Sequence, residues 1–496
     1  MHAPPSPPSR RRSIAIALLV AGAFFMENLD GTVITTAVPD MARTFGVAPI
    51  ALNVGVSAYL LTLGVFIPIS GWVADRFGSR RVFATAIFIF TFASLLCGLA
   101  QGLTEFVLLR ILQGIGGAMM VPVGRFVVLR TTPKERLIAA IATLTWPALA
   151  APVLGPPVGG FITNYASWRW IFYLNLPLGL IALVAALILI PRDDTHTRRP
   201  FDWLGFLLTG TALFSLLWTA ETLGQPDAEW TLAGVTFIIG AVLLAFGIRH
   251  LRRTPHPMIE LSAMRVPTFG VTMRGGSIFR MAIGAVPFLL PLMFQVGFGL
   301  DAFQSGLLMM AVFAGNLLMK PGTTPILRRF GFRRVLIVNG LINVAALASC
   351  ALFTPTTPVP VIAAILFLGG LTRSMQFTAF NTIAFADIPQ ERMSAANTLF
   401  STAFQIAMGL GIALGAIAVR LGGVLVEAAG LAGAPAASYR AAFLIVALVS
   451  LLALYDSIRL DPSAGDHIAR KPKPSDTKPA GTAPAESKPL TTASGK

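Results

Sequence analysis

Long apolar runs, each about as long as a bilayer crossing, alternate with short polar segments along most of this 496-residue chain. A membrane-spanning helix needs about 20 mostly apolar residues. The pattern predicts fourteen such helices. They occupy residues 13–38, 49–73, 82–101, 105–128, 138–163, 169–190, 203–220, 231–248, 268–296, 304–327, 335–353, 359–382, 394–419 and 439–458. We therefore expect an all-α integral membrane protein.

The composition narrows the functional classes. Apolar residues make up 55% of the chain and charged residues 12%, whereas a soluble protein carries roughly 25% charged residues. This excludes an ordinary soluble enzyme. Two cysteines, and five histidines without HExxH spacing, favour neither a disulfide framework nor a metal site. The chain has no GxxxxGK[ST] motif, so we do not expect ATP to supply energy. We expect no enzymatic activity, cofactor or metal.

Positive charge is distributed unequally between alternate loops. The formal net charge of +16 would suggest nucleic acid as a partner of a soluble protein, but here the basic residues separate apolar runs. One set of loops carries 21 Lys and Arg residues and the other carries four. Because basic loops stay in the cytoplasm, we predict that both termini are cytoplasmic and that no nucleic acid binds. The first apolar stretch lacks a clean cleavage site, which argues against a cleavable signal peptide.

An internal repeat divides the chain. RFGSRRV at residues 76–82 recurs as RFGFRRV at 329–335, and the same offset of 253 residues relates Cys97 to Cys350. A second pair begins at Pro133 and Pro389. Parallel repeats of this length are typical of transporter halves. The predicted units are a cytoplasmic tail (1–12), a six-helix bundle (13–190), a linker with two extra helices (191–267), a second six-helix bundle (268–458) and a disordered tail (459–496).

Several motifs together resemble the major facilitator superfamily, in particular its fourteen-helix drug:proton antiporter branch of the EmrB/QacA type. GWVADRFGSRR at 71–81 resembles the signature loop, and LLRILQGIGG at 108–117 resembles the fourth-helix motif. GPPVGG at 155–160 is similar to the antiporter motif, except that Ala151 stands where another glycine is usual. LDGTVITTAVP at 29–39 and WRWIFYLNLPLG at 168–179 resemble markers of the branch. The resemblance covers roughly residues 13–458.

The resemblance implies a function that the composition does not show. It implies a major-facilitator fold with two inserted central helices, in a bacterial-type cytoplasmic (inner) membrane. The implied activity is export of a small amphipathic compound, driven by the proton gradient through alternating access. Expected partners are the substrate, protons and the lipid bilayer, and a periplasmic adaptor protein is a further candidate. Two alternatives stay open: a non-transporting sensor or assembly protein on the same scaffold, and a proton symporter for uptake.

Glu27 and Asp30 are the candidates for proton coupling. We assign these two carboxylates to the interior of a span and the other twenty to loops and tails. An ionisable group inside a span is expensive and is a functional hypothesis by default. The i, i+3 spacing places both on one helix face, where two close carboxylates do not both ionise easily. Asp30 matches the family motif and is the first candidate to carry the proton, with Glu27 second. Arg110 is the expected partner of these acids. The alternative is a structural ion pair.

Two further motifs suggest conformational control. Asp75 lies at a cytoplasmic helix end and can pair with an arginine of its own loop. The resulting latch comprises Gly71, Asp75, Arg76, Gly78, Arg80 and Arg81. The antiporter motif, a predicted flexible packing face or else ordinary helix packing, comprises Gly155, Pro156, Pro157, Gly159 and Gly160.

Six basic residues fall inside predicted spans. They are Arg110, Arg125, Arg274, Arg280, Lys320 and Arg373. Arg125 and Lys320 lie near span ends, where long side chains can reach the membrane surface. We expect the second bundle to offer no carboxylate to Arg274, Arg280 and Arg373, which would then face the helix-one acids or meet an anionic substrate. The candidate cavity residues are Arg280, Arg274, Arg373, Trp146 and Met26.

Overall fold

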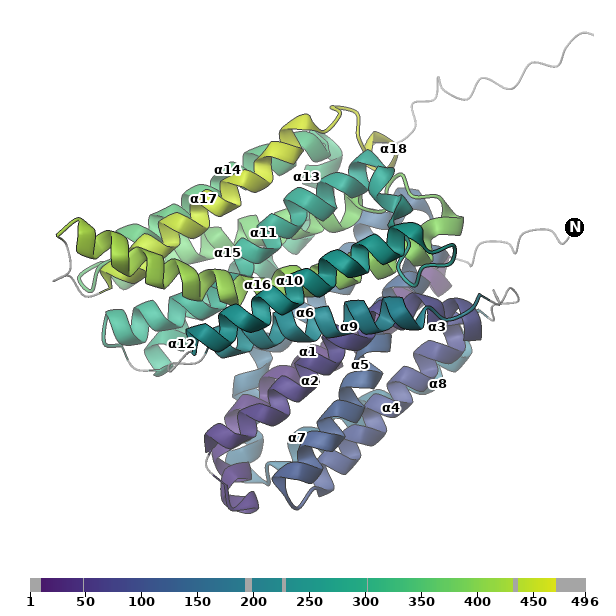
Figure 1. The fold of residues 1–496 in the computed structure, drawn as a ribbon, viewed down its shortest axis with the longest axis horizontal. Coiled ribbons are helices and arrows are strands. Elements are labelled where there is room, and N and C mark those ends of the chain that lie inside the picture. The colour runs from purple at the N-terminus through teal and green to yellow at the C-terminus, as the bar shows by residue number, and fades with distance from the viewer. Residues whose placement is uncertain are drawn as a thin grey trace, which may run out of the picture.

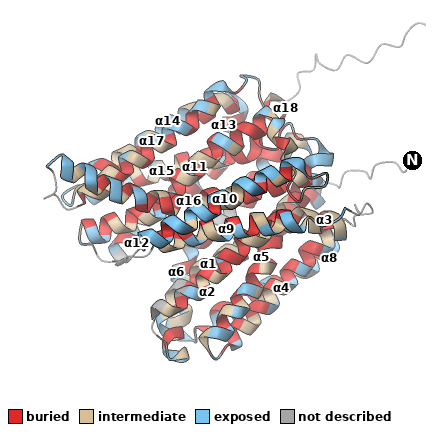
Figure 2. Cartoon of the chain, in the orientation of Figure 1, coloured by how far each residue is buried: buried red, intermediate tan, exposed pale blue. Residues whose placement is uncertain are grey.

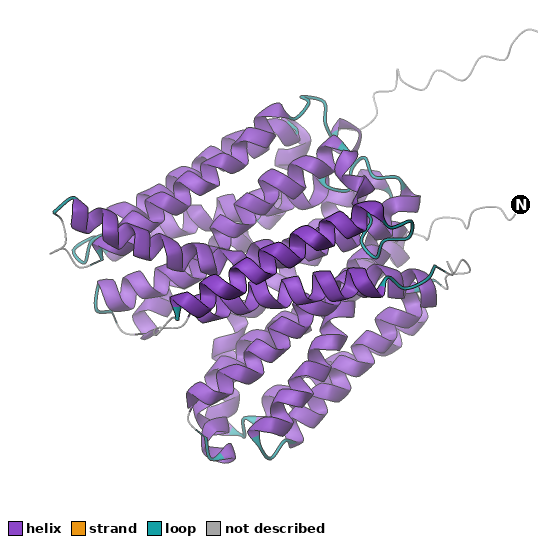
Figure 3. Cartoon of the chain, viewed as in Figure 1, coloured by secondary structure: helices purple, strands orange, loops and turns teal. Residues whose placement is uncertain are grey.

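The computed structural model describes residues 10–47, 49–191, 199–224, 229–300, 302–430 and 436–469. Within these ranges the secondary structure is helical and contains no strand (Figure 3). Long apolar segments form helices here because a helix satisfies all of its internal backbone hydrogen bonds within one segment.

The first half of the chain folds into a bundle whose apolar core lies largely among α1, α4, α5 and α8. Phe83 and Phe90 are fully buried in this core. The helices of this half are α1 (Arg10–Phe45), α2 (Asn53–Phe66), α3 (Ser70–Phe77), α4 (Ser79–Leu99), α5 (Leu103–Thr131), α6 (Leu137–Tyr165), α7 (Arg169–Tyr173) and α8 (Asn175–Leu189).

The second half forms another bundle, in which α11, α16 and α17 pack together and α12 pairs with α15. Phe294 and Phe443 belong to its core. Its helices are α11 (Pro267–Leu292), α12 (Ala302–Leu318), α13 (Lys320–Phe330), α14 (Phe332–Ser349), α15 (Val359–Ile383), α16 (Met393–Ala428), α17 (Ala437–Arg459) and α18 (Asp466–Ala469).

Two helices, α9 (Trp203–Gly224) and α10 (Trp230–Arg253), pack against each other between the two halves in the sequence. In space α9 contacts α2 of the first half and α16 of the second. The Leu217 side chain fits against Gly64 and Gly409, and a Cβ at either glycine would collide with it. One face of α10 is exposed along its length (Figure 2) and carries apolar residues such as Phe237 and Ile238. An apolar face of this kind suits contact with lipid.

Twelve helical stretches in the described part of the chain are long and apolar enough to cross a membrane. The predicted count of fourteen is therefore not confirmed. Helices lie at the positions of the other two predicted spans: α6, and the shorter apolar helix Gln304–Leu318 within α12. The predicted spans 49–73 and 304–327 are each interrupted. The first contains a 3-10 segment at Ile67–Ile69 that includes Pro68, and the second breaks between α12 and α13.

The repeated motifs adopt the same local structure in both halves. Gly78 separates α3 from α4 with φ +87°, and Gly331 separates α13 from α14 with φ +75°. Glycine fits this left-handed region without a Cβ penalty. Each glycine donates its amide to a preceding helix carbonyl, of Ala74 and Leu327 respectively, at 2.9 Å.

We call the end of the molecule that carries the Gly78 and Gly331 turns the basic end. The halves are joined there. Lys134 Nζ donates to the carbonyl oxygen of Ala386 at 3.1 Å, and Asn397 Nδ2 donates to that of Pro122 at 2.8 Å. Toward the other end, which carries α7 and the start of α12, the helices of the two halves diverge (Figure 1).

The start of the carboxyl-terminal tail is ordered, contrary to the predicted disorder of 459–496. Residues 461–465 form turns that lead into α18. Ile468 is buried against a cluster that includes Leu327 and Phe332, so the segment buries apolar surface that a sequence rich in Pro, Ser and Lys did not suggest. Residues 1–9 and 470–496 of the predicted tails lie outside the described residues.

Candidate functional site

A buried carboxylate, that of Asp30 on α1, accepts three side-chain hydrogen bonds from two other helices. Arg110 Nη1 donates to Oδ2 at 2.6 Å, and Gln113 Nε2 and Asn175 Nδ2 donate to Oδ1 at 3.0 and 2.9 Å. The side chains of Asp30 and Arg110 are both fully buried. The predicted partnership between these two residues is present. A charge in a low-dielectric interior needs such pairing and hydrogen bonding.

Further contacts hold this cluster in place. Gln113 Oε1 accepts a second bond from Arg110 Nη1 at 2.7 Å, since residues three apart on α5 share a face. Asn175 Nδ2 also donates to Ser94 Oγ at 3.0 Å. The Arg110 guanidinium lies 4.2 Å from the ring centroid of Tyr59, a cation–π distance. Five helices of the first half, α1, α2, α4, α5 and α8, thus converge on one ion pair.

Glu27 lies one turn before Asp30 and has a different environment. Its carboxyl group approaches Gly117, where a Cβ would lie 3.6 Å from Glu27 Cδ and 3.3 Å from the Tyr59 hydroxyl. Among the described residues, Glu27 Oε2 and the Tyr59 hydroxyl are buried without a hydrogen-bond partner. The predicted pair of acids therefore shares a helix face, but only Asp30 is bonded to a cation.

Sequence reasoning missed four members of this site: Gln113, Asn175, Ser94 and Tyr59. Gln113 lies in the fourth-helix motif at 108–117 and Asn175 in the motif at 168–179, yet neither is predicted to have a role. Their signal was available: each is an amide within an apolar span, and Gln113 is three residues from Arg110. Tyr59 had no such signal, because its contact with Arg110 depends on how α2 packs against α5. No group of three or more His, Cys, Asp or Glu that could hold a metal occurs in the described part.

The antiporter motif packs α6 closely against α1. A Cβ at Gly155 would lie 2.8 Å from Thr32 Cβ, and one at Gly159 would lie 2.8 Å from the carbonyl oxygen of Val33. Gly160 has no atom within 4 Å of such a position, and Pro157 is exposed. The side chain of Pro156 lies outside the described residues. Two of the motif's glycines therefore permit close helix contact.

The predicted latch lies at the basic end, where α3 meets α16. A Cβ at Gly71 would collide with the Thr398 side chain, so this glycine lets the two halves approach. Arg80 donates to the carbonyl oxygen of Leu187 on α8. Asp75 and Arg76 are half-buried on α3, and Arg81 is exposed. Pairing between Asp75 and an arginine of its own loop stays a prediction.

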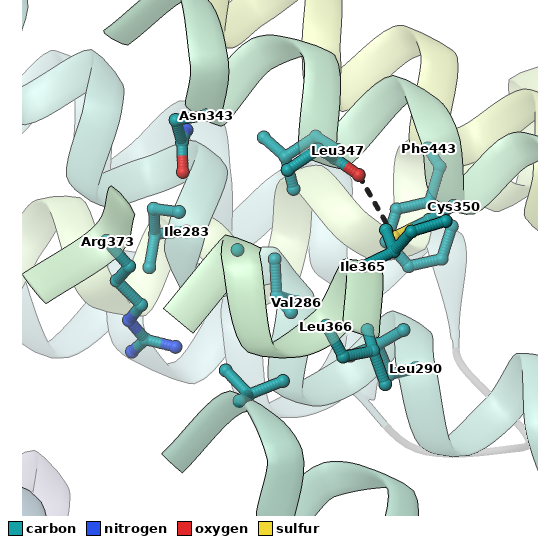
Figure 4. A pocket seen from close by; sticks show the side chains of 13 residues that line it. Ile283, Val286, Leu290, Asn343, Leu347, Cys350, Ile365, Leu366, Arg373 and Phe443 are labelled. Carbon is teal, nitrogen blue, oxygen red and sulfur yellow. Dashed lines mark hydrogen bonds between the residues drawn. The ribbon is translucent and has the colours of Figure 1, made fainter. Parts of the chain in front are cut away.

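The second half contains buried cations. Arg280 on α11 is 1% exposed and donates to neutral acceptors, the carbonyl oxygen of Thr272 at 3.3 Å and Asn381 Oδ1 at 3.2 Å. Arg373 borders a small apolar cavity of about 30 Å³, on the side opposite Cys350 (Figure 4). Lys320 is buried and donates to Thr378 Oγ1 at 3.1 Å, so it does not extend to the membrane surface as its position suggested.

Two other cavity candidates have different surroundings, and the third lies outside the described side chains. Arg274 pairs with Asp456 at 3.0 Å, and its side chain is 57% exposed. The expectation that the second bundle offers it no carboxylate was wrong: Asp456, assigned to the inner loops, lies within the predicted span 439–458 and within α17, which ends at Arg459. Met26 is 1% exposed within the apolar core of the first half. The side chain of Trp146 lies outside the described residues.

Comparisons with known proteins agree with this arrangement. The family model of the Major Facilitator Superfamily matches residues 20–412. A candidate multidrug resistance protein of Escherichia coli K12, MdtD, is 38% identical over 82% of this chain and 86% of its own length. The corresponding MdtD protein of Citrobacter koseri is 37% identical over 80% of this chain and 84% of its own length.

Two solved structures share the fold at low sequence identity. The human organic anion transporter MFSD10 (TETRAN) superposes with a TM-score of 0.60 at 14% identity, covering 91% of this chain and 100% of its own. The proton:xylose symporter XylE superposes with a TM-score of 0.62 at 15% identity, covering 92% and 98%. At such identities the likeness concerns the fold alone.

Proposed function

Because the chain belongs to the major facilitator superfamily and is a transporter, we propose that it is a proton-driven antiporter that exports small amphipathic compounds. Its MdtD relatives at 37–38% identity carry names that refer to multidrug resistance, which favours export over uptake. We further propose the fourteen-helix EmrB/QacA arrangement, with α6 and α12 as the two additional spans. The 21-to-4 distribution of basic residues between loops supports an inner-membrane protein with the basic end in the cytoplasm.

The unequal environments of Glu27 and Asp30 carry this proposal. Asp30 accepts hydrogen bonds from Arg110, Gln113 and Asn175, so one cation and two amide donors already surround its carboxylate. Glu27 is one turn away, and its Oε2 has no partner among the described residues. A buried carboxyl without a cation is stable when protonated, and it can release the proton when water or a cation reaches it. We therefore assign the exchanged proton to Glu27, in place of the first candidate Asp30, and a fixed counter-ion role to Asp30.

Alternating access supplies the coupling. Proton binding and substrate binding must favour different conformations if neither is to leak through the cavity. With the basic end in the cytoplasm, the joined halves there correspond to a state closed to the cytoplasm. Gly71 and Asp75 on α3 lie beside this junction, consistent with a latch that holds the state. A periplasmic adaptor remains a candidate partner.

Replacement of Glu27 by glutamine tests the proton assignment. In everted vesicles, a panel of amphipathic dyes and drugs first identifies a compound whose accumulation an uncoupler abolishes. We expect Glu27→Gln to reduce uphill accumulation of that compound by about tenfold or more, the usual size of a coupling effect, while downhill exchange continues. Glu105→Gln, at an exposed position on α5, is the matched control and should transport normally.

Two outcomes would contradict the proposal. If Glu27→Gln still drives uncoupler-sensitive accumulation, the proton travels by another group. If the unaltered protein accumulates its compound only in right-side-out vesicles, it is an uptake symporter. The topology is tested separately, by labelling single cysteines at Gln225 and Leu300 in a protein without Cys97 and Cys350. Labelling of either position from the cytoplasmic side would refute the proposed fourteen-helix topology.

A further inference from the structure

Two arginines from opposite halves approach the same aromatic ring. The Arg125 guanidinium, on α5, lies 5.1 Å from the ring centroid of Phe400 on α16. The Arg280 guanidinium, on α11, lies 4.8 Å from the same centroid and 5.3 Å from that of Phe404. Two positive groups are thus brought together where the halves meet. The arrangement calls for a negative group to balance them.

The arginines retain unused donors. Arg280 Nε and Arg125 Nη1 are buried and have no hydrogen-bond partner within the described ranges. The described partners of Arg280 are a backbone carbonyl and an amide oxygen, both neutral. Of the two acids on α1, Asp30 is already bonded to Arg110, and Glu27 Oε2 has no partner in the described part of the chain. A guanidinium presents five donors in a fixed fork that matches a carboxylate, sulfonate or phosphate.

Aromatic rings extend from this pair of cations. Phe400 packs against Phe385 at 5.2 Å and Phe404 at 6.2 Å, and Phe404 packs against Phe377 at 6.1 Å between ring centroids. We call these four residues the aromatic strip. The Arg373 guanidinium lies 5.8 Å from the Phe377 centroid. A planar apolar body could stack on the strip while its charged group met Arg280 and Arg125.

The space beside Phe400 is small in this conformation. Arg125, Asn381 and Phe400 border a cavity of about 10 Å³, which is roughly the room for one water molecule. Because its walls come from both halves, the cavity widens when the halves separate at the basic end. A larger ligand would therefore bind in that other conformation, from the side that the basic end faces.

We propose that Arg280 and Arg125 bind the carboxylate, sulfonate or phosphate group of an amphipathic organic anion whose apolar part stacks on the aromatic strip. This names a substrate class for the proposed exporter, and it rests on that function only for the step from binding to transport. Arg280 is the principal contact because it is 1% exposed, and Arg125 completes the site from the other half. The two guanidinium groups recognise the charged group, and the aromatic strip accepts apolar parts of different shapes with little selectivity.

A binding experiment on the purified full-length protein tests the site without requiring transport. The protein is placed in nanodiscs of phosphatidylcholine, and calorimetry compares naphthalene-2-sulfonate with naphthalene-2-sulfonamide, which has the same ring body without the charge. We expect Arg280→Gln to weaken sulfonate binding about tenfold, which is the loss expected when one charge-assisted hydrogen bond is removed. The weaker binding of the sulfonamide should not change. Arg280→Lys keeps the charge but not the planar guanidinium, so its affinity for the sulfonate should lie between those of the unaltered protein and Arg280→Gln.

Controls separate the possible outcomes. Arg253→Gln, at an exposed position on α10, should bind like the unaltered protein, and size-exclusion chromatography must show that each variant is folded. Equal affinities for the two probes, or sulfonate binding unaffected by Arg280→Gln and Arg125→Gln, would overturn the proposal. Competition by phosphatidylglycerol that depends on Arg280 would assign the site to a lipid headgroup and also overturn it. Sulfonate binding without proton-driven export would support the site and refute the proposed function.

Discussion

The two halves of the molecule share their turns but not their buried chemistry. Gly78 and Gly331 adopt the same left-handed conformation in corresponding loops. At similar burial, however, Arg110 in the first half is bonded to a carboxylate, whereas Arg280 in the second half is bonded to neutral oxygens. The repeat therefore preserves the geometry of the scaffold, while the charges that could act on protons and substrate have become specific to each half.

This difference predicts how each half responds to loss of a charge. A buried ion pair broken on one side leaves an uncompensated charge, which costs about 3–5 kcal/mol. Arg280 has no such partner among the described residues, and it rests on carbonyl oxygens and the faces of Phe400 and Phe404. The first half should therefore be the more sensitive, and the second half should have a charge available for a ligand.

The largest effect is expected for Asp30→Asn. The substitution keeps the shape of the side chain but leaves Arg110 buried without its counter-ion, so we expect a loss of about 3–5 kcal/mol in stability and no measurable transport in either direction. Thermal unfolding in detergent and vesicle assays provide the two measurements. Asp40→Asn, on the same helix but with an exposed arginine partner, should be close to neutral.

A double variant distinguishes structural from chemical loss. Asp30→Asn combined with Arg110→Gln removes both charges, so most of the stability should return. Transport should not return if the ion pair takes part in coupling. Recovery of full uphill export in the double variant would mean that the pair is structural alone, and the functional contrast between the halves would then disappear.

The junction between the halves offers the next test. Gly71→Val places side-chain atoms against Thr398, and overpacking of this kind costs about 1–3 kcal/mol. Since the clash exists only while α3 lies against α16, we expect a shift toward a conformation separated at the basic end. Spin labels on Phe77 and Arg392 should report longer distances. Gly22→Val is the control, because a Cβ at Gly22 has no atom within 4 Å; equal distances in both variants would place the moving contact elsewhere.

The sequence alone predicted most of the helices, because long apolar segments and the glycines that end helices are local signals. Every predicted span coincides with helix, even where Pro68 or the break after Leu318 interrupts it. The number of membrane crossings is less clearly encoded, since α12 has 17 residues and a crossing needs about 20. The order of residues 461–469 depends on Ile468 fitting against Phe332, a tertiary contact that composition does not reveal.

The candidate site was predicted in part for a similar reason. Asp30 and Arg110 were found because charges inside apolar spans are conspicuous. The sequence does not show which of the two acids bonds to Arg110. Glu27 and Asp30 lie on one face of α1, and the rotation of that helix determines which of them faces Arg110. Asp456 was misassigned although the predicted span 439–458 contains it, because a carboxylate in the last turn of an apolar span resembles the polar residues of the loop that follows. The stacking of Arg125 and Arg280 on Phe400 joins three helices from two halves and has no local signature.

A smaller effect is expected when the buried cation of the second half is made apolar. Arg280→Met removes a charge that has no acidic partner among the described residues and retains a long side chain. Apolar replacement of buried charges is often neutral or stabilising, so we expect a change within about 1 kcal/mol, against several kcal/mol for Arg110→Met. Chemical denaturation of both variants in the same detergent makes the comparison. A loss at Arg280 as large as that at Arg110 would show that neutral oxygens and aromatic faces compensate a guanidinium as well as a carboxylate does.

The smallest effect belongs to the one ion pair described between α11 and α17. Arg274 and Asp456 are 3.0 Å apart, but the arginine side chain is 57% exposed, so water screens the attraction and competes for both groups. Pairs in such settings contribute about 0.2–1 kcal/mol. A double-mutant cycle with Arg274→Gln and Asp456→Asn should therefore return a coupling energy in that range, and this energy should shrink as salt is added.

Asp30 and Arg110, measured by the same kind of cycle, should show a coupling energy several times larger and insensitive to salt, because both side chains are fully buried. Equal coupling energies for the two pairs would mean that burial does not set the strength of charge pairing here, and the proposed division of roles between the halves would lose its physical basis.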